Sequence, residues 1–185
     1  MTKTVRIVSR TLGVCLVVAS LAASAMAEDD GGSALKSTLL GSTPGQIIGG
    51  VSAGGAPWTV SKGHANLNTD GSLKVDIKGL VLLSVGTTGP VTEVSASLVC
   101  GGGGGVVVAT TGAVPLTVTG NAHIHDKVAV PPACIAPAIL VRVAAVNGTP
   151  LAQPGVFIAA NGFSAAQTES DSKKDKDKDD SADRF

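Results

Sequence analysis

Alternation of apolar and polar residues on both sides of a turn is the feature that most constrains this fold. In the stretch HANLNTDGSLKVDIKGLVLL, residues 64–83, apolar residues recur at every second position before and after Asp70-Gly71. This is the period of a β-strand with one buried face, because successive side chains of a strand point to opposite sides. The stretch therefore predicts a β-hairpin.

The phase of the two arms determines the length of the turn. A two-residue turn would place Leu67 opposite Lys74, which sets an apolar and a charged residue on the same face. The apolar faces agree only if Leu67 lies opposite Leu73, and this requires a three-residue loop over 69–71. A loop of this kind places glycine in the left-handed region as a bulge, so we predict a positive φ at Gly71.

Short runs rich in Val, Ala and Thr follow the hairpin and are separated by Gly and Pro. None shows apolar residues at helical spacing with caps, and β-branched residues favour a pleated surface. About eight short strands predict an all-β domain, either an antiparallel Ig-like β-sandwich or a small barrel. The candidate strands beyond the hairpin are 91–100, 106–110, 114–119, 122–130, 139–145 and 156–160.

Four segments divide the chain. Residues 1–27 carry basic residues, a short apolar run and Ala25-Met26-Ala27, which predicts a signal peptide and no stable membrane insertion after its cleavage. Residues 28–56 are rich in Gly, Ser and Thr and predict a flexible leader, in which Leu39-Leu40 and Ile47-Ile48 could add a short edge strand or stay loose. A β domain is expected over 57–163, and the densely charged residues 164–185 predict a disordered tail.

The charge balance bears on localisation and partners. Cleavage after Ala27 would remove three of the 14 Lys+Arg residues and leave 11 against 14 Asp+Glu. A mildly acidic chain argues against nucleic acid as a partner, because phosphate neutralisation dominates that affinity. We therefore expect a secreted protein, extracellular or periplasmic, whose partner is a protein or a glycan.

Two cysteines, Cys100 and Cys134, remain after the predicted cleavage, and an isolated pair in an exported chain predicts a disulfide. The alternative, a reactive thiol or a metal thiolate, lacks a partner motif such as C-x-x-C. Aromatic residues are scarce, so Trp58 is expected to anchor the core. The alternative for Trp58 is an exposed residue that stacks on a ligand.

The histidines are the candidate metal ligands. His123 and His125 stand two apart on a predicted strand, so both imidazoles could face one Cu or Zn ion. His64 points outward from its own strand and joins them if the strands are neighbours. The alternative interpretation is an exposed polar face that carries imidazoles and binds no metal.

The sequence contains no complete catalytic motif. The glycine run 101–105 is followed by neither Lys nor a helix, so it is not a phosphate-binding loop. There is no G-x-S-x-G, and no spacing of Ser, His and Asp singles out a triad. The acidic repeat DKDKDD lacks the glycine and the final Glu of a calcium loop. We therefore expect a protein that is not an enzyme.

The chain resembles a family of small, uncharacterised secreted bacterial proteins. The resemblance covers residues 57–162 and lies in WTV, the hairpin, VSASLVC, PLTVTGNAHI and VPPACIAPAILVRV. It implies secretion and a disulfide but no reaction. A weaker likeness is to the CHRD domain, a secreted β module, through Gly79-Leu80 and the Ala122 to His125 segment, which stand much further apart here.

Two hypotheses about function follow from the sequence. The first is a secreted, non-catalytic β module with a binding or structural role at the cell surface or outside the cell. The second is an exported Cu- or Zn-binding protein that uses His123, His125 and His64.

Overall fold

The computed structural model describes residues 32–162, so the predicted signal peptide and charged tail lie outside the described residues. Strands and one short 3-10 helix make up this region, and no helix in it has the length and apolar character needed to span a membrane. The elements are β1 (Ser33–Gly41), β2 (Ile47–Ile48), β3 (Val51–Ser52), β4 (Trp58–Thr59), β5 (Lys62–Asn68), β6 (Ser72–Lys78), β7 (Val81–Leu82), β8 (Val91–Cys100), η1 (Gly102–Gly104), β9 (Val106–Thr110), β10 (Val114–Pro115), β11 (Ala122–Lys127), β12 (Ala138–Val146), β13 (Thr149–Pro150) and β14 (Phe157–Gly162).

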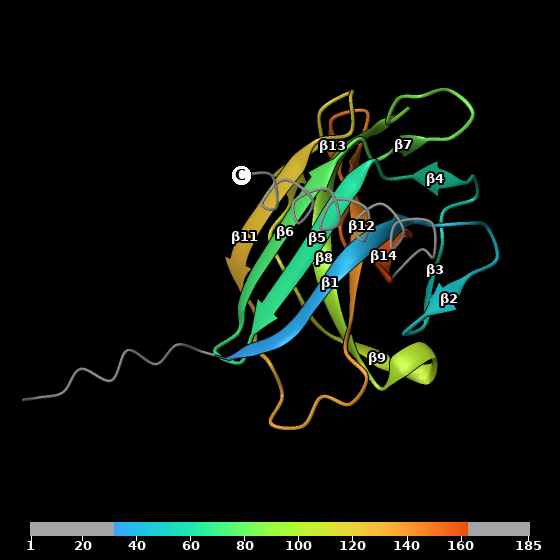
Figure 1. The fold of residues 1–185 in the computed structure, drawn as a ribbon. Coiled ribbons are helices and arrows are strands. Elements are labelled where there is room, and N and C mark those ends of the chain that lie inside the picture. The colour runs from blue at the N-terminus through green and yellow to red at the C-terminus, as the bar shows by residue number, and fades with distance from the viewer. Residues whose placement is uncertain (1–31, 163–185) are drawn as a thin grey trace, which may run out of the picture. The chain divides into compact units, whose positions relative to one another are not determined.

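The main sheet is antiparallel and curled, which confirms the predicted all-β class (Figure 1). Its strands follow the order β10-β8-β12-β14-β1-β5-β6-β11, with β9 paired to β8 and β13 to β12. The Gly112 N–H, in the loop between β9 and β10, donates to Asp126 Oδ2 on β11 at 3.0 Å. This hydrogen bond links the segment that leads into β10 with β11, the strand at the other end of the order. That bond lowers the pKa of the Asp126 carboxyl, since it stabilises the charged form.

The hairpin has the predicted register. Leu67 lies opposite Leu73 across β5 and β6, and a three-residue loop connects the strands. Gly71 has a φ of 88°, and a Cβ at this position would collide with the Val128 carbonyl oxygen. Lys74 is exposed and lies opposite Asn66. The phase argument therefore predicted both the pairing and the glycine.

The predicted flexible leader over 28–56 is wrong from Ser33 onward. Residues 33–41 form β1, a central strand that pairs with β14 on one side and β5 on the other. The sequence hid this strand because its alternation is broken: polar Ser37 lies on the core side, opposite Ala65, while apolar Leu40 lies on the other face. Gly41 resembles a linker glycine in the sequence, but its role is close packing, since a Cβ there would collide with the Trp58 carbonyl oxygen.

The core is almost entirely aliphatic and occupies the concave side of the sheet. Trp58 belongs to this main cluster and is 7% exposed, which supports its expected role as a core anchor. A second, smaller cluster around Val99, Leu140 and Phe157 covers the opposite face of β8, β12 and β14. The middle of β8 is therefore buried on both faces, including Ser97, whose hydroxyl bonds to Thr110 Oγ1 at 2.9 Å.

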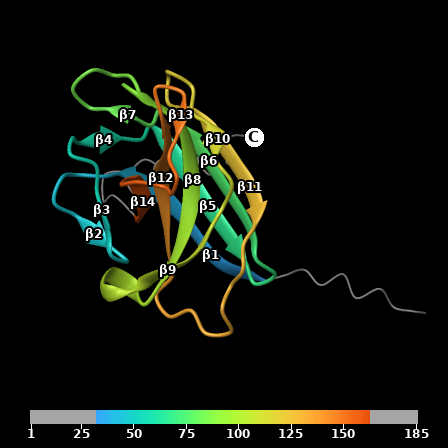
Figure 2. The ribbon, with the colours of Figure 1, turned by 180° about the vertical axis from the view of Figure 1, so that it is seen from behind.

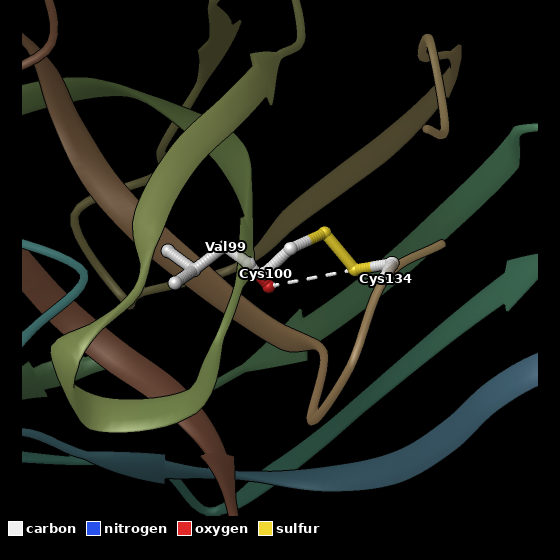
Figure 3. Close-up of a disulfide and its surroundings, with 3 residues drawn as sticks. All are labelled: Val99, Cys100 and Cys134. Atoms are coloured by element: carbon white, nitrogen blue, oxygen red, sulfur yellow. Dashed lines mark hydrogen bonds between the residues drawn. A yellow bond between two sulfur atoms is a disulfide. The ribbon is translucent and has the colours of Figure 1, made fainter. Parts of the chain in front are cut away.

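Cys100 and Cys134 form a disulfide, as predicted, with their Cα atoms 5.0 Å apart (Figure 3). The bond joins the end of β8 to the segment that leads into β12, and Cys134 Sγ lies 4.0 Å from the Val99 carbonyl oxygen. The Gly101 N–H donates to the Ile135 carbonyl at 2.7 Å. The disulfide and this hydrogen bond together fix the end of the molecule where β9 and η1 lie (Figure 2).

Removing the disulfide should destabilise the fold. The two cysteines are 34 residues apart, and a cross-link over a loop of this length stabilises by roughly 3–4 kcal/mol through the unfolded chain. We expect the C100S/C134S variant to lose a free energy of unfolding of about this size, measured by urea denaturation.

Reductant should lower the stability of the parent protein and leave the C100S/C134S variant unchanged. Two free thiols in the protein purified without reductant, detected by mass spectrometry, would contradict the assignment.

Candidate functional site

The structure places all three histidines on one exposed face of neighbouring strands. His64 on β5 lies opposite Asp76 on β6, and Asp76 lies opposite His123 on β11. His125 is two residues further along β11, opposite Lys74. The histidines thus share a surface, as the sequence hypothesis required, but the strand that carries Asp76 separates His64 from the other two.

A hydrogen bond orients one of these imidazoles. His123 Nδ1 lies 2.6 Å from Asp76 Oδ1, and both side chains are exposed. Engagement of Nδ1 leaves Nε2 as the ring nitrogen free to meet a ligand. Over residues 32–162, no three His, Cys, Asp or Glu side chains are grouped so that they could hold a metal ion. The Cu or Zn site at His64, His123 and His125 stays a prediction.

A second candidate site is a pocket that the sequence analysis missed. Its volume is about 330 Å³. Its lining comes from the segments around β4 and β7, from β12 and from the chain between β12 and β14. Figure 1 shows where these elements lie. The lining residues are Gly54, Gly55, Ala56, Trp58, Leu82, Pro90, Val91, Val143, Val146, Leu151, Gly155, Val156 and Ile158.

The chemistry of this pocket is uniform. Its lining side chains are aliphatic apart from Trp58, and the indole Nε1 is their only polar atom. Gly54 lies against the indole, since a Cβ there would stand 3.2 Å from Nε1. The sequence suggested that Trp58 either anchors the core or stacks on a ligand. In the structure it packs in the core and also presents part of its ring to the pocket.

Apolar side chains at the pocket are left partly in water. Leu151 and Val156 are each 39% exposed, although they belong to the lining. Exposed large aliphatic side chains grouped around a concavity are typical of a binding site rather than of ordinary surface. The pocket is therefore suited to an apolar group.

Arg142 holds one wall of the pocket in place. Its Nε donates to the Gly155 carbonyl at 2.8 Å, and a second guanidinium nitrogen donates to the Pro154 carbonyl. Burial lowers the pKa of Arg142, but a guanidinium keeps its charge at any physiological pH. A planar fork fits two neighbouring carbonyls, so Arg142 fixes the segment that carries Gly155 and Val156.

Sequence reasoning missed the pocket because its lining comes from five separate stretches of the chain, between Gly54 and Ile158. None of these stretches carries a motif. Trp58 was the one available signal, as the single tryptophan in a chain poor in aromatic residues.

These observations define an all-β domain with a disulfide and an open apolar pocket. Comparison of the chain with protein-family models, with curated proteins and with solved structures finds no match.

Replacing Arg142 with Lys tests the role of the guanidinium. Lysine keeps the positive charge but cannot bind two carbonyls in a fork. A hydrogen bond to a charged group is worth about 1.5–3 kcal/mol, so we expect R142K to lose a free energy of unfolding of about this size. We also expect acrylamide to quench the Trp58 fluorescence more strongly, because the pocket wall is released.

Lys36→Gln is the control, since Lys36 is exposed and surface substitutions usually change stability by less than about 0.5 kcal/mol. An R142K protein with the stability and quenching of the parent would show that these hydrogen bonds do not hold the wall.

Proposed function

We propose that the protein is an exported, non-catalytic binding module that holds a small apolar group in the Trp58 pocket. The observation that carries the proposal is the lining, which offers thirteen apolar or glycine positions and one indole N–H. Sites of this composition bind by excluding water from apolar surface, with few polar groups to set orientation.

The pocket lining also argues against catalysis at this site. None of its residues has a carboxylate, imidazole, thiol, hydroxyl or amine side chain. General acid-base and nucleophilic catalysis both need such a group within hydrogen-bond reach of the substrate. The apolar lining suits binding of an apolar group, whereas catalysis at this site would require acidic, basic or nucleophilic side chains that the lining lacks.

Export is supported by the disulfide. Cystines persist in oxidising compartments such as the periplasm and the extracellular medium and are rare in the cytosol. The Cys100–Cys134 pair is consistent with either of these compartments. We propose secretion, with the binding role exercised at the cell surface or outside the cell.

The size of the pocket limits its occupant. A volume of about 330 Å³ is at the lower end of ligand sites, which span roughly 300–1,000 Å³. The occupant is therefore a compact apolar group with at most a few polar atoms. An acceptor on that group could take the Trp58 indole N–H, which is the one polar side-chain group of the lining.

The single tryptophan provides a direct test of the pocket. The neutral apolar fluorophore N-phenyl-1-naphthylamine should bind beside Trp58 and receive its excitation energy. Gly55→Leu should weaken this binding at least about ten-fold, a loss of about 1.4 kcal/mol, because Gly55 belongs to the lining and a leucine there would crowd the pocket. Gly55 has open space at its Cβ position, so the fold can accept the substitution.

Gly104→Leu is the matched control. Gly104 also has open space at its Cβ position but lies in η1, away from the pocket lining. Equal weakening by both variants, or binding without energy transfer from Trp58, would overturn the pocket as the binding site.

Binding of Cu or Zn by His123 and His125 is the second candidate function. The hydrogen bond from His123 Nδ1 to Asp76 supports it, because a metal-binding imidazole commonly donates its other nitrogen to a carboxylate. We expect added Zn²⁺ to perturb the resonances of both histidines if this function is real. Unperturbed histidine resonances would dispose of it.

A further inference from the structure

The lysines of residues 32–162 are gathered on one face of the sheet. All five are exposed, and strand pairing places their side chains on the outer side of β1, β5, β6 and β11, which lie side by side in Figure 1. They are Lys36 on β1, Lys62 on β5, Lys74 and Lys78 on β6, and Lys127 on β11. We call this surface the lysine face.

Cross-strand register arranges the lysine face in rows. One row runs from Lys36 through Asn66 and Lys74 to His125. The next row holds His64, Asp76 and His123. Neighbouring strands are about 4.8 Å apart, and residues two apart on one strand are separated by about 6.6–6.8 Å. Lysines therefore lie on both sides of the His64–Asp76–His123 row, with Lys36 and Lys74 on one side and Lys62 and Lys78 on the other, at spacings that suit a chain of repeated anionic groups.

Negative charge on this face is sparse. Asp76 is its one carboxylate within the rows, and it is hydrogen-bonded to His123. Asp70 stands at the hairpin end of the face, with its carboxylate 3.8 Å from Lys127 Nζ. Of the chain's 14 Asp+Glu residues, ten lie outside residues 32–162. The whole chain therefore has a net charge of zero, although the lysines make this surface of the sheet cationic.

One pairing on the face is unfavourable for the isolated protein. Lys62 lies directly opposite Lys78 across β5 and β6. Like charges in directly opposed positions destabilise a sheet. A bound anion would relieve this repulsion, so the pair favours an anionic partner and opposes a bound cation.

The chemistry of the face selects among anionic polymers. The large apolar residues that are exposed lie outside these four strands, so nothing here would insert into a lipid bilayer. The face has no Phe, Tyr or Trp to stack on bases and no arginine to grip phosphate in a fork. It has lysines, which are mobile point charges, together with imidazoles and amides that can bond to hydroxyl groups.

We propose that the lysine face binds a linear anionic polysaccharide along the rows formed by β1, β5, β6 and β11. Lysines pair with its carboxylate, sulfate or phosphate groups, and the Asn66, His64 and His125 side chains bond to its hydroxyls. This function is independent of the Trp58 pocket, which lies elsewhere in the fold and shares no residue with the face.

The test is binding of the full-length exported protein to immobilised polygalacturonate and dextran sulfate, with uncharged dextran as the reference. We expect binding to both anionic polymers, a steep loss of affinity with added salt, and none to dextran. K74Q/K78Q should weaken binding about ten-fold, because charge contacts supply most of such an affinity.

V106E/V108E is the matched control. It makes the same change in net charge on two exposed residues of β9, outside the lysine face, and should alter affinity less than about two-fold. Equal weakening by both variants would overturn the proposal, because binding would then follow net charge and not this face. Equal or tighter binding to duplex DNA or to phosphatidylglycerol vesicles would overturn the choice of partner.

A folding measurement separates lost binding from lost structure. K74Q/K78Q removes the opposed pair of Lys62 and Lys78, so its unfolding midpoint in urea should be equal to or above that of the parent. A lower midpoint would show that these lysines stabilise the sheet, and the proposal would then be rejected.

Discussion

The pairing of β1 on both of its edges is the interaction on which the rest of the sheet depends. In the strand order, β1 lies between β14 and β5, so it joins the hairpin half of the sheet to the half built from β8, β12 and β14. Buried Leu39 fixes its register against the core, and Thr38 Oγ1 donates to the Gly162 carbonyl. Both the lysine face and the curl that surrounds the core require this continuity.

The sequence could predict what local periodicity controls. The pairing of Leu67 with Leu73, the φ of Gly71 and the bounds of β8 and β9 follow from alternation and turn chemistry, and the structure has them all. The cysteine pair followed from composition. β1 could not be recognised, because Ser37 and Leu40 break its alternation and Gly41, which has a packing role, resembles a linker glycine.

The two candidate binding surfaces were hidden for a different reason. The Trp58 pocket depends on how five segments meet, and no period or motif in any one of them reveals that meeting. The lysine face depends on which strands become neighbours, since Lys36 and Lys127 are far apart in the chain. The net charge of the whole chain is zero and gave no sign of a cationic surface, because most of its carboxylates lie outside residues 32–162. Site chemistry of this kind arises from topology and cannot be read from composition.

The position of β1 also governs when the molecule can complete its fold. β1 is the first strand of the sheet to leave the ribosome, whereas its neighbour β14 is the last. β1 can pair with β5 early, but its other edge stays unpaired until nearly the whole domain has been made, and non-local pairings of this kind form slowly. Under the proposed export, this delay would be useful, because an incompletely paired chain can pass through a translocation channel and the sheet can close on the far side, where the cystine can form.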